Sequence, residues 1–332
     1  MAHASSPPAE FQQRGAPLIA VEPIPRCPVC GGEKFSNFAS GFDYELLSCA
    51  NEWQFVECRA CTHVWLHPRP AIATLPVIYP PHYYAYNYAS NINSIAVQAK
   101  ALLDRRKLQG IVAALGRAPR SFLDIGCGDG RFLRSMETLG VPREKNYGLE
   151  LDEKVVAPLR AQGFQAFCER VEDCRRIPDN SMDVMTMFHV IEHVDDPAAV
   201  VRQAAKWLAP GGVFAVETPN LDSLDARLFR RNYWGGYHIP RHWNLFRAQT
   251  LARLLEDRGL KVIGTRYQTG HSFWMYSQHH WWRYHGTPRP GLARCFDPFK
   301  GLPFLAAFTV FDKVRAALGA KTSAVLMLAT KK

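Results

Sequence analysis

Residues 122–133 read FLDIGCGDGRFL, and this pattern indicates the class of fold. Apolar residues at 121–125 predict a short buried strand, and the spacing of apolar residues at 131–139 predicts a helix. Between them, every second residue from 126 to 130 is glycine. Glycines let the backbone turn sharply and approach a ligand, while the first turn of a helix presents unpaired N–H groups. These residues therefore predict a strand, a ligand-binding turn and a helix in succession.

The same alternation continues on both sides of the glycine turn. Further strands are predicted at residues 147–150, 164–167, 182–188, 212–218, 261–267 and 323–330, and further helices at 95–115, 153–162, 197–208 and 250–258. Strands separated by helices of about ten residues form βαβ units, in which helices cover both faces of a parallel sheet. We therefore expect an α/β fold for most of the chain.

The glycine turn favours a positively charged adenosyl ligand. Its G-x-G-x-G spacing differs from the G-x-G-x-x-G of dinucleotide folds, and it lacks the Gly-Lys-Ser/Thr pattern that binds triphosphates. Glu150 ends the next predicted strand, where a carboxylate can accept hydrogen bonds from both hydroxyls of a ribose. Asp124 adds a second carboxylate, which would repel an anionic ligand and attract an ammonium or sulfonium group.

At this point the chain resembles the class I S-adenosylmethionine-dependent methyltransferases. The resemblance rests on residues 123–132, 148–152, 178–184 and 189–197. It implies a Rossmann-like sheet of seven strands, the last of them antiparallel. It also implies that S-adenosylmethionine lies over the glycine turn and that Glu150 binds its ribose.

The resemblance assigns the remaining cofactor contacts residue by residue. The expected contacts are Asp124, Gly126, Gly128, Gly130, Glu150, Val171, Glu172 and Phe188. Val171 and Glu172 follow the third strand and are expected beside the adenine. Phe188 and His189 follow the fourth strand and are expected to face the methionine portion.

A small module before this domain carries two C-x2-C pairs, CPVC at 27–30 and CRAC at 58–61. Four thiolates in two such pairs can fill a tetrahedral zinc shell, which leaves no open position for catalysis. We therefore expect structural zinc on Cys27, Cys30, Cys58 and Cys61. Cys49, His63 and His67 remain possible substitute ligands. Disulfides are the alternative, and the expected reducing compartment disfavours them.

The domain boundaries follow from composition. Residues 1–25 are rich in Pro, Ala and Ser and are expected to form a disordered leader. Residues 26–68 form the zinc-binding module, residues 69–94 a Pro- and Tyr-rich linker, and residues 95–332 the methyltransferase domain. The order of these parts resembles bacterial enzymes of deoxysugar and surface-polysaccharide pathways.

Three histidines are candidate catalytic bases. His189 and His193 follow the fourth strand, at the sheet edge where ligands of such folds bind, and His242 lies in a Gly- and aromatic-rich loop. If residues 189–193 are helical, Glu192 shares a face with His189. Glu192 and a histidine could then hold a divalent ion, or Glu192 and His193 could simply brace the neighbouring helix.

Residues 269–322 form a long insertion between the last two strands. They contain seven Lys and Arg residues against two Asp, and eleven aromatic residues, including Trp281, Trp282 and Phe308. Phe304, Phe308, Phe311 and Leu318 approximate one helical stripe. The insertion is expected either to rest on an anionic membrane surface, covering a lipid-linked acceptor, or to pack as a lid.

Composition limits the functional classes. The net charge of +10 favours anionic partners, no apolar run is long enough to span a membrane, and no secretion signal is visible, so we expect a cytoplasmic protein. The leading prediction is methyl transfer from S-adenosylmethionine to a small-molecule or lipid-linked acceptor, such as a sugar. One alternative is an RNA methyltransferase that uses the zinc module to bind RNA, although the chain lacks the Asn-Pro-Pro-aromatic motif of base amino methylation. The other is a non-catalytic zinc-stabilised adaptor.

Overall fold

A seven-stranded sheet forms the centre of the computed structural model, which describes residues 8–80 and 94–332. Its strands are β6 (Phe122–Ile125), β7 (Asn146–Glu150), β8 (Gln165–Cys168), β9 (Met182–Phe188), β10 (Leu208–Pro219), β12 (Leu260–Gln268) and β13 (Ala324–Lys331). They lie in the order β12-β13-β10-β9-β6-β7-β8, and β13 is antiparallel to both of its neighbours. The predicted α/β fold, with a seven-stranded sheet and an antiparallel last strand, is confirmed.

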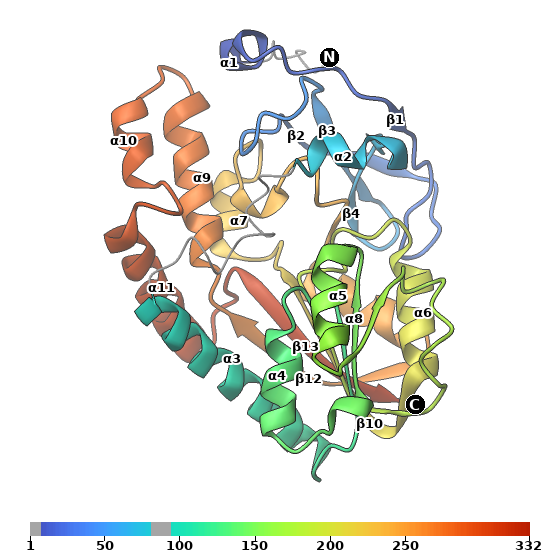
Figure 1. Ribbon diagram of the computed structural model, residues 1–332. Helices are drawn as coiled ribbons and strands as arrows, with labels where there is room; N and C mark the ends of the chain where they lie inside the picture. The colour runs from blue at the N-terminus through green and yellow to red at the C-terminus, as the bar shows by residue number, and fades with distance from the viewer. Residues whose placement is uncertain (1–7, 81–93) are drawn as a thin grey trace.

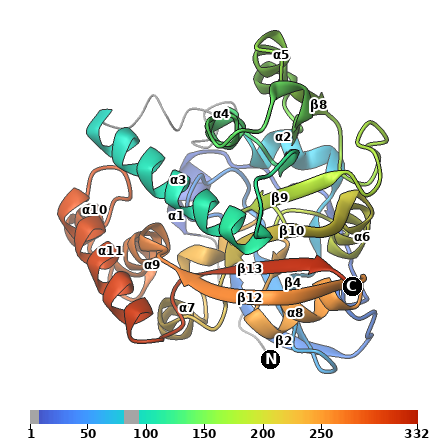
Figure 2. The ribbon, with the colours of Figure 1, turned by 90° about the horizontal axis from the view of Figure 1, so that it is seen from below.

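Helices cover both faces of this sheet, as Figure 2 shows along its edge. One face carries α3 (Ser94–Leu115), α4 (Arg131–Thr138) and α5 (Glu153–Ala161), and the other carries α6 (Pro197–Trp207) and α8 (Ala248–Glu256). Successive side chains of a strand point to opposite faces, so Phe122 packs in the first core and Leu123 in the second. The inner strands β6, β9 and β13 are therefore buried on both faces, whereas the edge strand β12 is partly exposed.

The N-terminal module is joined to the large domain by a shared sheet and a shared core. Its strands β2 (Phe35–Gly41), β3 (Trp53–Cys58) and β4 (Val64–Leu66) form a four-stranded sheet completed by β11 (Asn244–Leu245). Asn244 pairs with Trp65 across the β11–β4 edge. Trp65 also packs in the same core as Leu251 of α8. The module and the large domain therefore fold against each other (Figure 1).

The expectation of a disordered leader is wrong for residues 8–25. Helix α1 (Ala9–Gln13) is followed by β1 (Val21–Glu22), which pairs with β5 (Arg69–Pro70). Phe11 is 1% exposed and packs 5.7 Å from Phe42, measured between ring centroids. Composition could not reveal this contact, because burial of Phe11 depends on residues far along the chain. The expectations for residues 1–7 and for half of the Pro/Tyr linker, residues 81–93, concern parts of the chain outside the described residues.

The insertion between β12 and β13 is helical. It consists of α9 (His271–Tyr284), α10 (Pro290–Cys295) and α11 (Leu302–Ala317), which stand together beside the sheet in Figure 1. Within residues 8–80 and 94–332, no helix combines the length and the apolar composition that crossing a bilayer would require.

Candidate functional site

The glycine turn connects β6 to α4 at the carboxyl edge of the sheet. Gly126 and Gly128 have φ values of +76° and +49°, a region that side chains other than glycine rarely adopt. A Cβ atom on Gly126 would lie 2.3 Å from Cγ2 of Val190, so the inner side of the turn is tightly packed. A Cβ atom on Gly128 would meet no described atom within 4 Å. The backbone at Gly128 is therefore open to a ligand.

Glu150 is held at this turn by the backbone. Its Oε2 accepts a hydrogen bond of 3.1 Å from the Gly128 N–H, and its Oε1 accepts one of 2.7 Å from the Leu151 N–H. Both bonds fix the carboxylate at the end of β7, next to the open side of the turn. The residue predicted to bind a ribose thus lies beside the glycine turn.

Asp124 is buried at the base of the same turn and is only partly satisfied. Its Oδ1 accepts a hydrogen bond of 2.7 Å from the Thr186 hydroxyl. Within the described part of the chain, its buried Oδ2 has no hydrogen-bond partner. Burial raises the pKa of Asp124 to about 8. A ligand that brings a donor or a positive charge would therefore stabilise this carboxylate, which fits S-adenosylmethionine.

The other predicted cofactor contacts line the adjoining strand ends. Val171 is 8% exposed and packs in the core below β8. Glu172 accepts a hydrogen bond of 3.1 Å from Arg170. Phe188 ends β9, where its ring lies edge-on to Phe132, with centroids 5.1 Å apart. Val171 and Glu172 follow β8, and Phe188 ends β9; these are the third and fourth strands of the large sheet in chain order.

His189 forms a charged group rather than a free base. Residues 189–193 form a turn, not the helix considered above, and His189 has a φ of +56°. Its Nδ1 lies 3.2 Å from Oε1 of Glu192, and its Nε2 lies 3.4 Å from Oε1 of Glu217. The imidazole is 43% exposed. Desolvation by the surrounding protein opposes its charge, but hydrogen bonds with these two carboxylates outweigh that effect and raise the pKa of His189 to about 9. His189 therefore carries a proton at neutral pH.

The structure brings His193 and His242 together. Their rings lie edge-to-face, with centroids 4.6 Å apart. Nδ1 of His193 lies 3.0 Å from the carbonyl oxygen of Arg241, and Nδ1 of His242 lies 2.8 Å from that of Gly236. A carbonyl can only accept a hydrogen bond, so each Nδ1 carries the proton and each Nε2 keeps a lone pair.

Both of these imidazoles are neutral at physiological pH. Burial lowers the pKa of His193 to about 4, and burial also holds the pKa of His242 well below its usual value. Glu192 lies beside them, and one potential ligand atom from each of the three residues falls within 4.8 Å of the others. The pair can therefore accept a proton from a bound molecule.

Glu45 and Tyr79, which the sequence did not reveal, complete this cluster together with His238. His238 stacks edge-to-face on His242, with centroids 5.0 Å apart, and its Nδ1 lies 2.7 Å from Oε2 of Glu45 in the N-terminal module. The Tyr79 hydroxyl lies 3.0 Å from Nδ1 of His193. Neither Glu45 nor Tyr79 belongs to a recognisable motif, so only the three-dimensional contact identifies them.

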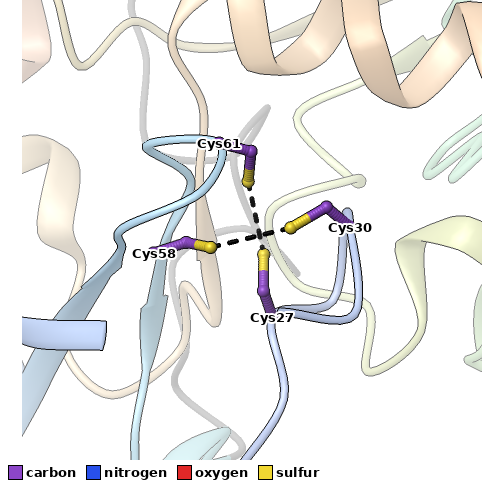
Figure 3. A group of neighbouring side chains, drawn as sticks. All are labelled: Cys27, Cys30, Cys58 and Cys61. Carbon is purple, nitrogen blue, oxygen red and sulfur yellow. Dashed lines mark hydrogen bonds between the residues drawn. The ribbon is translucent and has the colours of Figure 1, made fainter. Parts of the chain in front are cut away.

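The four predicted metal ligands converge on one point, as Figure 3 shows. Sγ of Cys27 lies 3.5 Å from Sγ of Cys61, and Sγ of Cys30 lies 3.6 Å from Sγ of Cys58. All four are free thiols, and their sulfur atoms lie within 4.8 Å of one another. Disulfides require about 2.05 Å, whereas tetrahedral zinc–thiolate bonds of 2.3 Å place sulfurs roughly 3.8 Å apart. The spacing fits a metal.

Comparison with known proteins identifies the large domain. A sequence profile of the methyltransferase domain family matches residues 98–265, just over half of the chain. The ubiquinone biosynthesis O-methyltransferase of Neisseria meningitidis is 32% identical over 162 residues, which cover 45% of this chain and 67% of that protein. The enzyme of the same name from Xanthomonas oryzae is 32% identical over 120 residues, which cover 34% of this chain and 49% of that protein.

Among solved structures, an S-adenosylmethionine-dependent methyltransferase from Archaeoglobus fulgidus aligns with a TM-score of 0.46 at 18% identity, covering 70% of this chain and 94% of that one. The sequence matches agree with the observed order of strands and with the open glycine turn beside Glu150. The chain therefore belongs to the class I S-adenosylmethionine-dependent methyltransferases.

Proposed function

We propose that the protein transfers a methyl group from S-adenosylmethionine to a hydroxyl group of a small acceptor, either a sugar or a sugar carried on a lipid. The observation that carries the proposal is the pair of neutral imidazoles, His193 and His242, in the loops next to the glycine turn. Val190, which precedes this pair in the chain, abuts Gly126. Methylation of a hydroxyl requires a proton acceptor near the bound methyl donor.

On the donor side, the glycine turn binds and orients S-adenosylmethionine. When bound, S-adenosylmethionine supplies an electrophilic methyl group on a positively charged sulfur. The open backbone at Gly128 admits the ligand, Glu150 accepts hydrogen bonds from its ribose hydroxyls, and Asp124 offers its unpaired oxygen. Val171 and Glu172 border the adenine in this proposal, and Phe188 faces the methionine portion.

On the acceptor side, a neutral histidine takes the proton. Nε2 of His193 or His242 accepts it from the acceptor hydroxyl, because each Nδ1 already donates to a backbone carbonyl. His189, being protonated, cannot be the base, and in this proposal it balances the charge of Glu192 and Glu217. Of the three histidines that were candidates from the sequence, two therefore remain as bases.

The class of acceptor follows from two resemblances. The Neisseria relative is named an O-methyltransferase, which favours an oxygen atom as the methyl acceptor. The order of four-cysteine module, linker and methyltransferase domain resembles enzymes of deoxysugar and surface-polysaccharide pathways, which favours a sugar.

The four-cysteine cluster is proposed to hold structural zinc. Its four thiols leave no open coordination position, so the ion would stabilise the N-terminal module and take no part in catalysis. The module in turn supplies Glu45 to the histidine cluster.

A methyl-transfer assay tests the proposed function. Tritiated S-adenosylmethionine is incubated with the wild-type protein and nucleotide sugars, polyprenyl-phosphate-linked sugars, a polyprenyl phenol or RNA, and the labelled product is identified by mass spectrometry. We expect label on a sugar hydroxyl. We also expect His193→Gln to lower turnover by roughly 100-fold or more while calorimetry shows unchanged cofactor affinity. Labelled RNA, or full activity of both His193→Gln and His242→Gln, would contradict the proposal.

A further inference from the structure

Helix α11 presents apolar residues to solvent and keeps its acidic residue inside. Val310, Val314 and Leu318 follow one another at intervals of four residues and therefore share one face, and they are 61%, 53% and 81% exposed. Leu302 is 64% exposed, and Phe304 and Phe311 are each 42% exposed. A helix on a soluble surface normally has the opposite arrangement, with its apolar side turned inward.

Asp312 determines which side of the helix is buried. It is the only acidic residue of α11, and it is 0% exposed. Its carboxylate accepts hydrogen bonds from the Gly270 N–H at 3.1 Å, from Nε1 of Trp274 at 3.2 Å and from the Ser323 hydroxyl at 3.0 Å. Nη1 of Arg315 lies 3.2 Å from Oδ1 of Asp312 and balances the charge of this carboxylate. Because these bonds anchor Asp312 to α9 and to the start of β13, the helix cannot rotate its apolar face inward.

The aromatic residues considered above for membrane contact are half-buried and pack against neighbouring side chains. Phe308 stacks on Trp274, with centroids 5.2 Å apart and planes at 7°. Trp281 stacks on His285, with centroids 3.8 Å apart. Trp282 lies under the guanidinium of Arg289 at 5.6 Å. The exposed apolar surface is therefore made by the outward residues of α11. We call these residues the α11 face: Leu302, Phe304, Val310, Phe311, Val314 and Leu318.

The charges around the α11 face have one sign. Between residues 289 and 321, every exposed charged residue is basic: Arg289, Arg294, Lys300, Lys313 and Lys321. Lys321 pairs with Asp222 at 3.1 Å, so the excess positive charge comes from the other four. The two acids of this segment do not offset them, because Asp312 is buried and Asp297 is half-buried. An apolar face rimmed by cations matches an anionic bilayer, where apolar side chains enter the headgroup region and cations meet the phosphates. A second copy of the chain would instead bring like charges together.

We propose that the α11 face docks the protein on the surface of an anionic lipid membrane. The docked surface is connected to the acceptor site through α9. Trp274 of α9 contacts Asp312 and Phe308, and the neighbouring Phe273 lies 6.3 Å from His189, measured between ring centroids. The helix that docks therefore packs on α9, the same helix that contacts His189. If the proposed function is correct, this arrangement suits a sugar carried on a membrane lipid.

The test is vesicle sedimentation of the full-length protein, without any acceptor. Vesicles contain phosphatidylcholine either alone or with phosphatidylglycerol. We expect binding to the anionic vesicles, weaker binding to the neutral ones, and further weakening as salt is raised. No methyl transfer is measured in this test. An absence of vesicle binding would therefore not contradict the proposed function, and an inactive enzyme would not contradict membrane docking.

The decisive variant is the triple substitution Val310→Ser, Val314→Ser and Leu318→Ser. It should lower vesicle binding about tenfold or more, because the apolar contact is lost while every charge is kept. The matched control replaces three exposed apolar residues elsewhere, Leu18, Leu228 and Ile263, by Ser. This control should bind vesicles as the wild type does.

Calorimetric titration with S-adenosylmethionine verifies that both triple variants are folded. Two outcomes would overturn the proposal: equal vesicle binding by the α11 variant and the wild type, or no binding of the wild type to anionic vesicles. A wild-type dimer in light scattering that the α11 variant converts to a monomer would also overturn it, since a second copy would then cover the face.

Discussion

Asp43 and Arg241 form a completely buried, bidentate ion pair between the N-terminal module and the histidine loop. Nη1 of Arg241 lies 3.1 Å from Oδ1 of Asp43, Nη2 lies 2.9 Å from Oδ2, and both side chains are 0% exposed. Arg241 also donates from Nε to the carbonyl of Ile78 at 2.7 Å. The pair thus fixes the loop that carries His238 and His242 against the module. Arg241 is therefore a structural residue, with its guanidinium bound to Asp43 and to the Ile78 carbonyl.

Breaking the pair from one side should destabilise the protein strongly. Asp43→Ala leaves the Arg241 guanidinium buried without its counter-charge, so we expect the free energy of unfolding to fall by about 3–5 kcal/mol. Urea denaturation at pH 7 measures the change. The double variant Asp43→Leu with Arg241→Leu should lose less than the two single Leu variants together, because no unpaired charge remains. A loss below about 1 kcal/mol for Asp43→Ala would contradict the structural role.

The strands of the large sheet were predictable because they depend on local pattern. Alternating apolar runs and helical periods are properties of short segments, and the predicted alternation of strands and helices follows from them. The number of strands was implied by the family resemblance, and the four-cysteine cluster by its two C-x2-C spacings. The Asp43–Arg241 pair was not predictable, since its partners are 198 residues apart and no local signal says which loops meet. The two-residue strand β11 was also not predictable, because two residues are too few to show an alternation of apolar and polar positions.

Helix α11 illustrates a different limit of prediction from the sequence. Its helical spacing was predicted, but the sequence left open whether the stripe that includes Phe308 faces a membrane or packs inward as a lid. The orientation depends on Asp312, which a sequence pattern treats as a solvated charge and which the structure buries among Trp274, Ser323 and the backbone of Gly270. Only the tertiary partners of an acid reveal that its helix face is the inner one.

Gly128→Val should abolish cofactor binding without unfolding the protein. The substitution places a side chain in the open space of the turn and strains a backbone with φ of +49°, at a cost of about 1–3 kcal/mol. Gly116→Val is the matched control, because Gly116 has φ of +73° and equally open space but lies at the end of α3. Both variants should lose similar stability in urea. Calorimetry should show that only Gly128→Val loses affinity for S-adenosylmethionine, by about 100-fold or more. Equal affinities in the two variants would refute the assigned cofactor turn.

Cys58→Ser should remove the metal from the N-terminal module. A serine hydroxyl is a poor substitute for a thiolate, and three thiols no longer complete the shell. Elemental analysis should find one zinc ion per chain in the wild type and close to none in the variant. Because the module shares a core with the large domain, thermal unfolding should also shift to lower temperature.

Two other cysteines serve as controls for the metal count. Cys49 is buried in the same module outside the cluster, and Cys295 is exposed on the distant insertion. Neither Cys49→Ser nor Cys295→Ser should change the zinc content. Full zinc content in Cys58→Ser, or loss of zinc in Cys295→Ser, would show that the four-cysteine site is wrong.

His189 should titrate far above an ordinary histidine. Its hydrogen bonds with Glu192 and Glu217 raise its pKa to about 9 against the opposing effect of burial, whereas a free histidine titrates near 6.5. Because the folded pKa lies above the unfolded one, the charge contributes stability that is complete below pH 6.5 and is lost as pH rises through 9. Glu217→Gln should move the pKa of His189 down, and Glu45→Gln, which alters only the contact with His238, should leave it unchanged. NMR titration of the histidine ring protons between pH 5 and 10 measures the pKa of His189 in the wild type and in both variants. A wild-type His189 that loses its proton near pH 6.5 would restore this residue as a candidate base and remove the charge assignment made here.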